Sequence, residues 1–195
     1  MIYVEGGGDS KALRRLCAEG FHKLLVKCGF SRMPRLVACG GRGATYERFC
    51  TEHATSSDGD YVALLVDSED PVTDIGATWR HLRQRDNWTR PNGATDDQVL
   101  LMVTCMETWV ASDRKSLADH YGAGLQESAL PPLVDLEGRA RETIQEALTR
   151  ATRNCSNFYT KGKRSFEVLG KLDPGTLEQY LPSFSRARAI LASTL

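Results

Sequence analysis

The chain has 195 residues, of which 41% are hydrophobic and 26% charged, a composition that is ordinary for a globular domain and excludes the disordered and fibrous classes. Its 25 Lys and Arg residues balance its 25 Asp and Glu residues. No overall positive field therefore draws in a polyanion, and any contact with nucleic acid has to be local. No apolar run approaches the roughly 20 residues that span a bilayer, and no basic segment is followed by a long apolar one. We expect a cytoplasmic protein without a membrane partner.

The six cysteines do not form a zinc-binding pattern. They contain no C-x-x-C pair and have no histidines at matching spacing. We expect reduced and mostly buried thiols at Cys17, Cys28, Cys39, Cys50, Cys105 and Cys155.

The pattern along most of the chain predicts alternating strands and helices. Apolar residues at helical spacing over residues 13–28 indicate an amphipathic helix, and Asp9 or Ser10 can cap its start. The uninterrupted apolar run at residues 61–66 is typical of a strand buried on both faces, as in a parallel sheet. In chain order, the predicted strands are residues 2–4, 36–39, 61–66 and 98–106, and the predicted helices are residues 13–28, 45–53, 77–85 and 112–121.

The last third of the chain has a different character. After a loop at Pro131 and Pro132, the pattern from Asp135 onward is helical with interruptions. We therefore predict an α/β, Rossmann-like fold with a mainly parallel sheet of about four strands flanked by helices and joined by right-handed crossovers. Residues 1–125 would form this α/β core, and residues 126–195 a helical extension packed on it as part of a single structural unit.

Carboxylates occur where the predicted strands end. Glu5 follows the first strand, Asp67, Glu69 and Asp70 follow the third, and Glu107 ends the fourth. In open α/β sheets the ligand crevice lies at the carboxyl ends of the strands, so we expect these side chains to converge. Like charges repel unless a cation lies between them, and a site with only oxygen ligands indicates a hard ion, Mg²⁺ or Mn²⁺.

The stretch VEGGGDSKAL at residues 4–13 could also be taken for a nucleotide-binding loop. It lacks the spacing of the G-x-x-x-x-G-K-[ST] loop and that of the G-x-G-x-x-G fingerprint. A glycine cluster alone is more often a tight turn between a strand and a helix. Glu5 therefore fits a metal site, and the glycines would let a backbone come close to it.

Four segments in order, VEGGGD, LLVDSED, CMETW and YTKGKRSFEVLGKLDP, carry a family resemblance that covers most of the chain. The glutamate after the first strand and the Asp-x-acidic motif after a later strand resemble the TOPRIM domain of topoisomerases, primases, overcoming-lysogenization-defect nucleases and RNase M5-type enzymes. The wider spacing is similar to that of a small stand-alone bacterial family of TOPRIM-like proteins of unknown function.

The resemblance implies a phosphodiester enzyme that uses Mg²⁺. In this match Glu5 is the first-strand acid, a metal ligand or general acid/base, and Asp67 with Glu69 stands where the family has Asp-x-Asp. Glu69 is one methylene longer than the family's residue, so either Glu69 or Asp70 can complete the metal shell, and one or two ions can bind. Glu107 matches no shared signature and is included because its predicted strand end faces the same crevice.

Basic residues could hold the phosphate near this site. Residues 139–164 contain seven Lys or Arg against two Glu, and Lys161, Lys163 and Arg164 are candidates for nucleic-acid binding, the two lysines also for catalysis. A solvated helix face is an equal alternative for this basic segment. Arg42, in the turn after the second strand, is a further candidate phosphate contact.

Three functions from different classes remain open. The first is a metal-dependent nuclease acting on DNA or RNA, which the resemblance connects with an effector of anti-phage defence. The second is a conditional or inactive subunit that acts only with a partner ATPase, and the third is a nucleotide-binding or phosphatase-type enzyme on the same sheet. The carboxylates at three strand ends favour the first over the second, and the absent phosphate-loop spacing counts against the third. A homodimer is possible.

Overall fold

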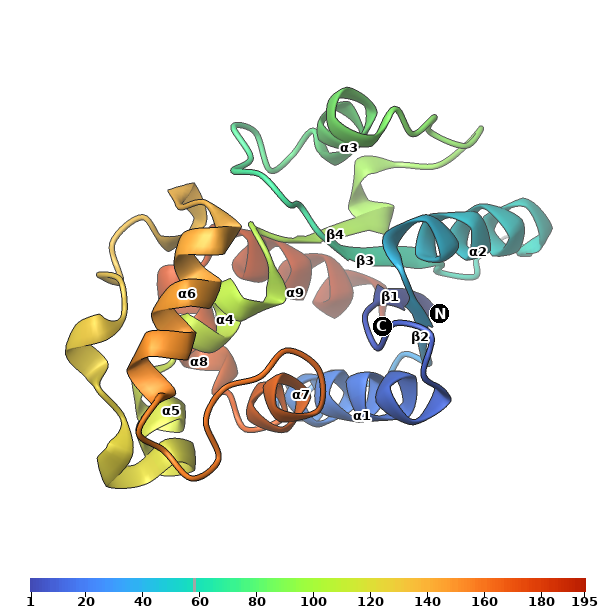
Figure 1. Cartoon of the computed structure of the whole chain (residues 1–195). Helices are drawn as coiled ribbons and strands as arrows, with labels where there is room; N and C mark the ends of the chain where they lie inside the picture. Colours follow the sequence, from blue (N-terminus) through green and yellow to red (C-terminus); the bar gives the residue numbers. More distant parts are fainter. Residues whose placement is uncertain (58) are drawn as a thin grey trace.

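A computed structural model describes residues 1–57 and 59–195. Four parallel strands form one sheet in the order β2-β1-β3-β4, with helices on both faces (Figure 1). The predicted Rossmann-like α/β fold with a four-stranded parallel sheet is confirmed. The strands are β1 (Ile2–Glu5), β2 (Leu36–Gly40), β3 (Ala63–Asp67) and β4 (Val99–Met102).

The chain leaves β1 and β3 toward opposite edges of the sheet. From β1 it passes through α1 (Lys11–Lys27) to β2, and α2 (Arg42–Thr55) then returns it to β3 on the other side of β1. From β3 it passes through α3 (Thr78–Asp86) to β4. The carboxyl ends of β1 and β3 therefore form a topological switch point, where open α/β sheets bind their ligands.

Alternating side chains of the strands supply two separate hydrophobic clusters. On one face, Ile2 and Val4 of β1 pack with α1 and the C-terminal helices. On the other face, Tyr3 packs with Phe49 of α2 and Trp79 of α3. Figure 1 shows α2 and α3 above the sheet and α1 below it. The strands are apolar on both faces because helices cover both, as the run at 61–66 predicts.

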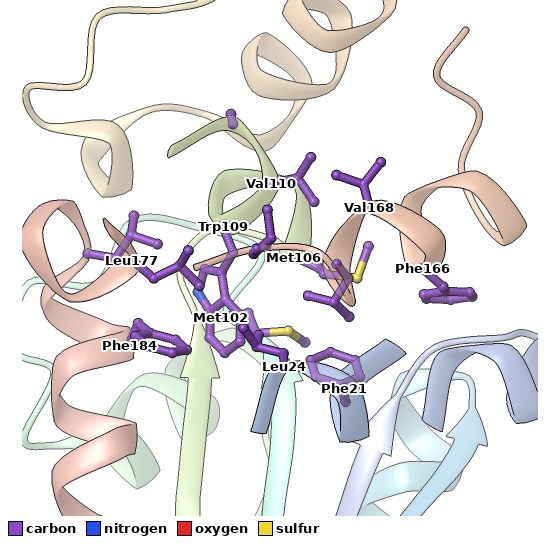
Figure 2. Packing of buried hydrophobic residues seen from close by; sticks show 14 of the residues in the cluster. Phe21, Leu24, Met102, Met106, Trp109, Val110, Phe166, Val168, Leu177 and Phe184 are labelled. Carbon is purple, nitrogen blue, oxygen red and sulfur yellow. The ribbon is translucent and has the colours of Figure 1, made fainter. Parts of the chain in front are cut away.

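The C-terminal helices belong to the same cluster as α1 and one face of the sheet. The helices are α4 (Met106–Ser112), α5 (Arg114–Tyr121), α6 (Arg141–Thr152), α7 (Lys163–Leu169), α8 (Pro174–Tyr180) and α9 (Pro182–Thr194), with short 3-10 turns at Asp96–Gln98, Gly122–Gly124, Glu127–Ala129 and Leu136–Gly138. Figure 2 shows Met102 of β4 beneath Met106 and Trp109 of α4, with Phe184 of α9 to one side and Val168 of α7 to the other. Residues 126–195 therefore share a hydrophobic core with the sheet.

The fourth strand is shorter than predicted. A strand over 98–106 is expected from the apolar run, but β4 ends at Met102 and α4 begins at Met106. Every residue of α4 is buried, and a continuous apolar run does not by itself distinguish a buried strand from a buried helix. The prediction of one strand up to 106 is therefore wrong, and the helix α4 that follows was not predicted.

The cysteines are unpaired in the described part of the chain, and all except the half-buried Cys50 are buried, as predicted. Burial raises the pKa of the Cys17 thiol to about 12, with the nearby Asp67 carboxylate adding to the shift. Across residues 1–57 and 59–195, no helix has the length and apolar character needed to cross a membrane.

Helices α1 and α7 lie side by side below the sheet (Figure 1), and they meet at a glycine. A Cβ atom on Gly20 of α1 would lie 2.6 Å from the carbonyl oxygen of Phe166 in α7 and 3.5 Å from a methyl of Leu169. Backbone atoms cannot retreat from such a contact as the end of a flexible side chain can. The absence of a side chain at Gly20 therefore sets how closely the two helices pack.

We expect Gly20→Ala to lower the free energy of unfolding by about 1–2 kcal/mol, because the overpacking exceeds the helix-propensity gain of about 1 kcal/mol. The matched control is Gly43→Ala in α2, where an added Cβ meets nothing within 4 Å and stability should stay equal or rise slightly. Urea denaturation of both variants checks this. Wild-type stability in Gly20→Ala would show that the helices do not depend on this contact.

Candidate metal centre at the ends of β1 and β3

Three carboxylates meet at the switch point. Glu5 is the last residue of β1, Asp67 is the last residue of β3, and Glu69 follows two residues later. One carboxylate oxygen from each lies within 4.8 Å of the other two. The structure thus brings together three of the acids that the sequence places at strand ends, because β1 and β3 are parallel neighbours and end at the same edge.

Each of these carboxylates keeps one oxygen available. Asp67 Oδ1 accepts a hydrogen bond from the backbone N–H of Met106 at 2.8 Å, and Glu5 Oε2 accepts from the backbone N–H of Asp67 at 3.3 Å. Glu5 Oε1, Asp67 Oδ2 and Glu69 Oε1 accept no hydrogen bond from the residues that the structure describes. Three oxygen donors are therefore available to one ligand.

The electrostatics of the site favour a bound cation. Asp67 is only 8% exposed, and burial raises its pKa well above the ordinary range, with the charges of Glu5 and Glu107 adding to the shift. Burial also raises the pKa of Glu5, while Arg42 partly offsets the shift. Both effects show that ionised carboxylates are held here at a cost, which a cation placed between them would remove.

Glu69 is fixed by two helices, and Asp70 is not part of the cluster. Glu69 has a backbone φ of +69°, uncommon for a residue with a side chain. Its Oε2 pairs with Arg141 at the start of α6 and, at 3.6 Å, with Arg85 of α3. The side chain of Asp70 is 68% exposed and pairs with Arg85 at 3.4 Å. Of the two acids that the sequence leaves open, the geometry selects Glu69.

Glu107 is not at the end of a strand, which corrects the sequence prediction. It lies in the first turn of α4 and is 1% exposed. Its Oε1 accepts a hydrogen bond from Tyr159 Oη at 2.7 Å, and its Oε2 accepts one from Gln145 Nε2 at 3.4 Å. Glu107 still lines the same cavity as Glu5 and Asp67, because α4 starts directly beneath that edge of the sheet.

The sequence predicts that Arg42 contacts a phosphate. In the structure, its guanidinium forms ion pairs and hydrogen bonds with other residues of the protein. Its Nε and Nη2 donate to Asp86 at 2.9 and 2.6 Å. Its Nη1 donates to Glu5 Oε2 at 3.2 Å and also to the carbonyl oxygen of Asp67. The guanidinium lies 4.8 Å from the centre of the Trp88 ring, which stacks on Tyr46 at 4.4 Å. Arg42 therefore positions Glu5 against β3.

The three basic candidates of the C-terminal third separate in space. Lys161 lines the cavity and lies close enough to Glu5 and Asp67 to favour their ionised forms. Lys163 has a side chain that is 68% exposed and pairs with Glu167 at 3.9 Å. Arg164 donates to the carbonyl oxygen of Phe158 at 2.7 Å. Of these three, only Lys161 faces the carboxylates.

A cavity of about 420 Å³ opens beside the carboxylates. Its walls come from β1 and the glycine turn after it, the start of α1, the ends of β2 and β3, the start of α4, and the segment that begins α7. Its lining residues are Glu5, Gly6, Gly7, Gly8, Asp9, Ser10, Leu13, Gly40, Asp67, Met106, Glu107, Lys161, Gly162, Ser165 and Phe166. The site therefore has room for a substrate as well as an ion.

We expect Asp86→Ala to lower the free energy of unfolding by about 3 kcal/mol, because it leaves the largely buried Arg42 without its main partner. The control is Asp119→Ala, which removes an exposed partner of Lys115 and should change stability by less than about 0.5 kcal/mol. Urea denaturation measures both. Equal effects would mean that the Asp86–Arg42 pair does not organise the site.

One comparison with known proteins gives a match. The model of a family described as a domain of unknown function, DUF4276, matches residues 4–191. The curated proteins and the solved structures contain no match to this chain. Because the family model spans both the sheet and the C-terminal helices, the chain belongs to the DUF4276 family.

Proposed function

We propose that this protein is a metal-dependent nuclease that cleaves phosphodiester bonds of DNA or RNA. The observation that carries the proposal is the cluster of Glu5, Asp67 and Glu69, whose oxygens lie within 4.8 Å of one another at the switch point of the sheet. The cavity beside them is also lined by Lys161. A site for a cation and a site for an anion thus share one cleft.

The three carboxylates fit a hard divalent ion. Oxygen donors without histidine or thiolate suit Mg²⁺ or Mn²⁺, and burial makes the uncompensated charges of Glu5 and Asp67 costly. When bound, such an ion lowers the pKa of a coordinated water and neutralises charge on the phosphate.

The surrounding residues orient these groups. The N–H of Met106 fixes Asp67, and Arg42 fixes Glu5. Lys161 would attract the substrate phosphate from the cavity wall. Glu107, whose Oε1 is held by Tyr159, is a candidate to accept a proton from the attacking water inside the cavity.

A conditional subunit is the second candidate, and the arginines favour it. Arg42 already pairs with Glu5, and Arg85 and Arg141 pair with Glu69. These pairs neutralise two of the three proposed ligands, as would suit a resting state that a partner ATPase releases. Cleavage by the isolated chain would decide for the nuclease, and activity only after addition of the partner would decide for the conditional subunit.

We expect Asp67→Asn to lower Mg²⁺-dependent cleavage of a mixed DNA and RNA substrate by at least about 100-fold, since it removes a charged ligand from the centre of the site. Asp70→Asn, a change of the same chemistry at an exposed neighbour outside the cluster, should retain activity. Gel-based cleavage assays with and without EDTA measure this. Full activity in Asp67→Asn would refute the site assignment.

The same variant should be more stable than the wild type at neutral pH. Because burial raises the folded-state pKa of Asp67 above its ordinary value of 3.8, folded protein binds this proton more tightly than unfolded protein does. The stabilisation that the protonated Asp67 carboxyl contributes to the folded state is complete below pH 3.8, and it is lost as the pH rises through the raised pKa. Asparagine cannot ionise. Urea denaturation without metal should therefore show Asp67→Asn to be more stable than the wild type at about pH 7 and equally stable at about pH 3.5. A variant less stable than the wild type at neutral pH would contradict this.

A further inference from the structure

We propose that the cavity beside the carboxylates is a subsite for one unpaired nucleotide, so that the substrate is single-stranded nucleic acid or an unpaired end. This inference rests on the proposed nuclease function and names its substrate class. It is carried by the size of the cavity, by the chemistry of its walls and by its position next to Glu5 and Asp67.

The size of the cavity excludes a duplex. Its volume of about 420 Å³ lies within the roughly 300–1,000 Å³ range of small-molecule sites. A B-form duplex, whose major groove alone is about 12 Å wide, cannot enter such a space. Enzymes that do chemistry on a base inside a pocket act on single strands or on a nucleotide turned out of the duplex, and the same limit of space applies to a base that enters this cavity. One nucleotide can therefore reach Asp67, but paired bases cannot.

Besides Lys161, the cavity has an acidic wall and an apolar wall. Glu5, Asp67 and Glu107 form an acidic wall, whereas Leu13 of α1 and Phe166 of α7 are apolar. A free phosphate would gain nothing from apolar side chains. A nucleotide offers a charged phosphate to the acidic wall through the ion, and an apolar base face to the others. The cavity therefore matches both parts of a nucleotide.

Two of the glycines that line the cavity have no close neighbours. At Gly8 an added Cβ would meet nothing within 4 Å, and at Gly162 it would meet only the methyl groups of Leu13, at 3.9 Å or more. Both glycines have a positive φ that residues with side chains rarely adopt. The backbone at these two positions therefore borders the cavity without filling it.

Leu13→Trp tests the subsite, because the larger ring would occupy the cavity. The probe is a fluorescently labelled single-stranded pentanucleotide, with binding measured by anisotropy in Ca²⁺, which carboxylate oxygens also bind, so that an ion lies between the phosphate and the acidic wall; a gel checks that the probe stays intact. We expect its affinity to fall by about 10-fold or more in Leu13→Trp. Ala12→Trp is the matched control, because Ala12 is an exposed neighbour on α1 that does not line the cavity, and it should bind as the wild type does.

A second measurement does not depend on a variant folding. With Mg²⁺, the wild type should cleave a single strand at least about 10-fold faster than the same sequence within a duplex hairpin. Equal cleavage of the duplex interior, or unchanged binding in Leu13→Trp, would overturn the subsite while the nuclease function stands. Absence of cleavage with binding lost only in Leu13→Trp would support the subsite and refute the nuclease. Absence of single-strand binding by the wild type would overturn the subsite.

Discussion

Parallel pairing of β1 with β3 is the constraint on which the site depends. It places Glu5 and Asp67 at one edge of the sheet, where Asp67 is buried and the Glu5 side chain is 17% exposed. Two carboxylates held this way repel each other and are poorly solvated, which the raised pKa values of both residues express. This arrangement lowers the stability of the folded state, and strongly shifted pKa values of this kind are typical of functional sites.

The rest of the molecule counters that cost and shapes the cleft. Arg42 of α2, itself held by Asp86 and Trp88, secures Glu5 from one side of the sheet. The C-terminal third supplies Arg141 to Glu69, and it also supplies Tyr159 to Glu107 and Lys161 to the cavity wall. The C-terminal third, through α6 and the loop between α6 and α7, thus completes the site as well as covering the sheet. The family model likewise covers both parts of the chain.

The sequence predicted the parts of the site that depend on strand ends. Glu5 and Asp67 follow apolar runs with clear limits, so their positions could be inferred from periodicity alone. Glu107 was placed at a strand end because a buried helix and a buried strand share the same apolar run. The partners of Arg42 and Glu107 could not be predicted, because Asp86 and Tyr159 lie 44 and 52 residues away in the chain and meet them only through tertiary packing.

The proposed metal centre is tested most directly by titrating Mn²⁺ into the isolated wild-type chain and into a Glu5→Gln, Asp67→Asn double variant, with binding followed by calorimetry and no nucleic acid present. We expect saturable binding to the wild type that is lost in the double variant while its fold is retained. Absence of binding to the wild type, or equal binding to both proteins, would contradict a metal site at the ends of β1 and β3.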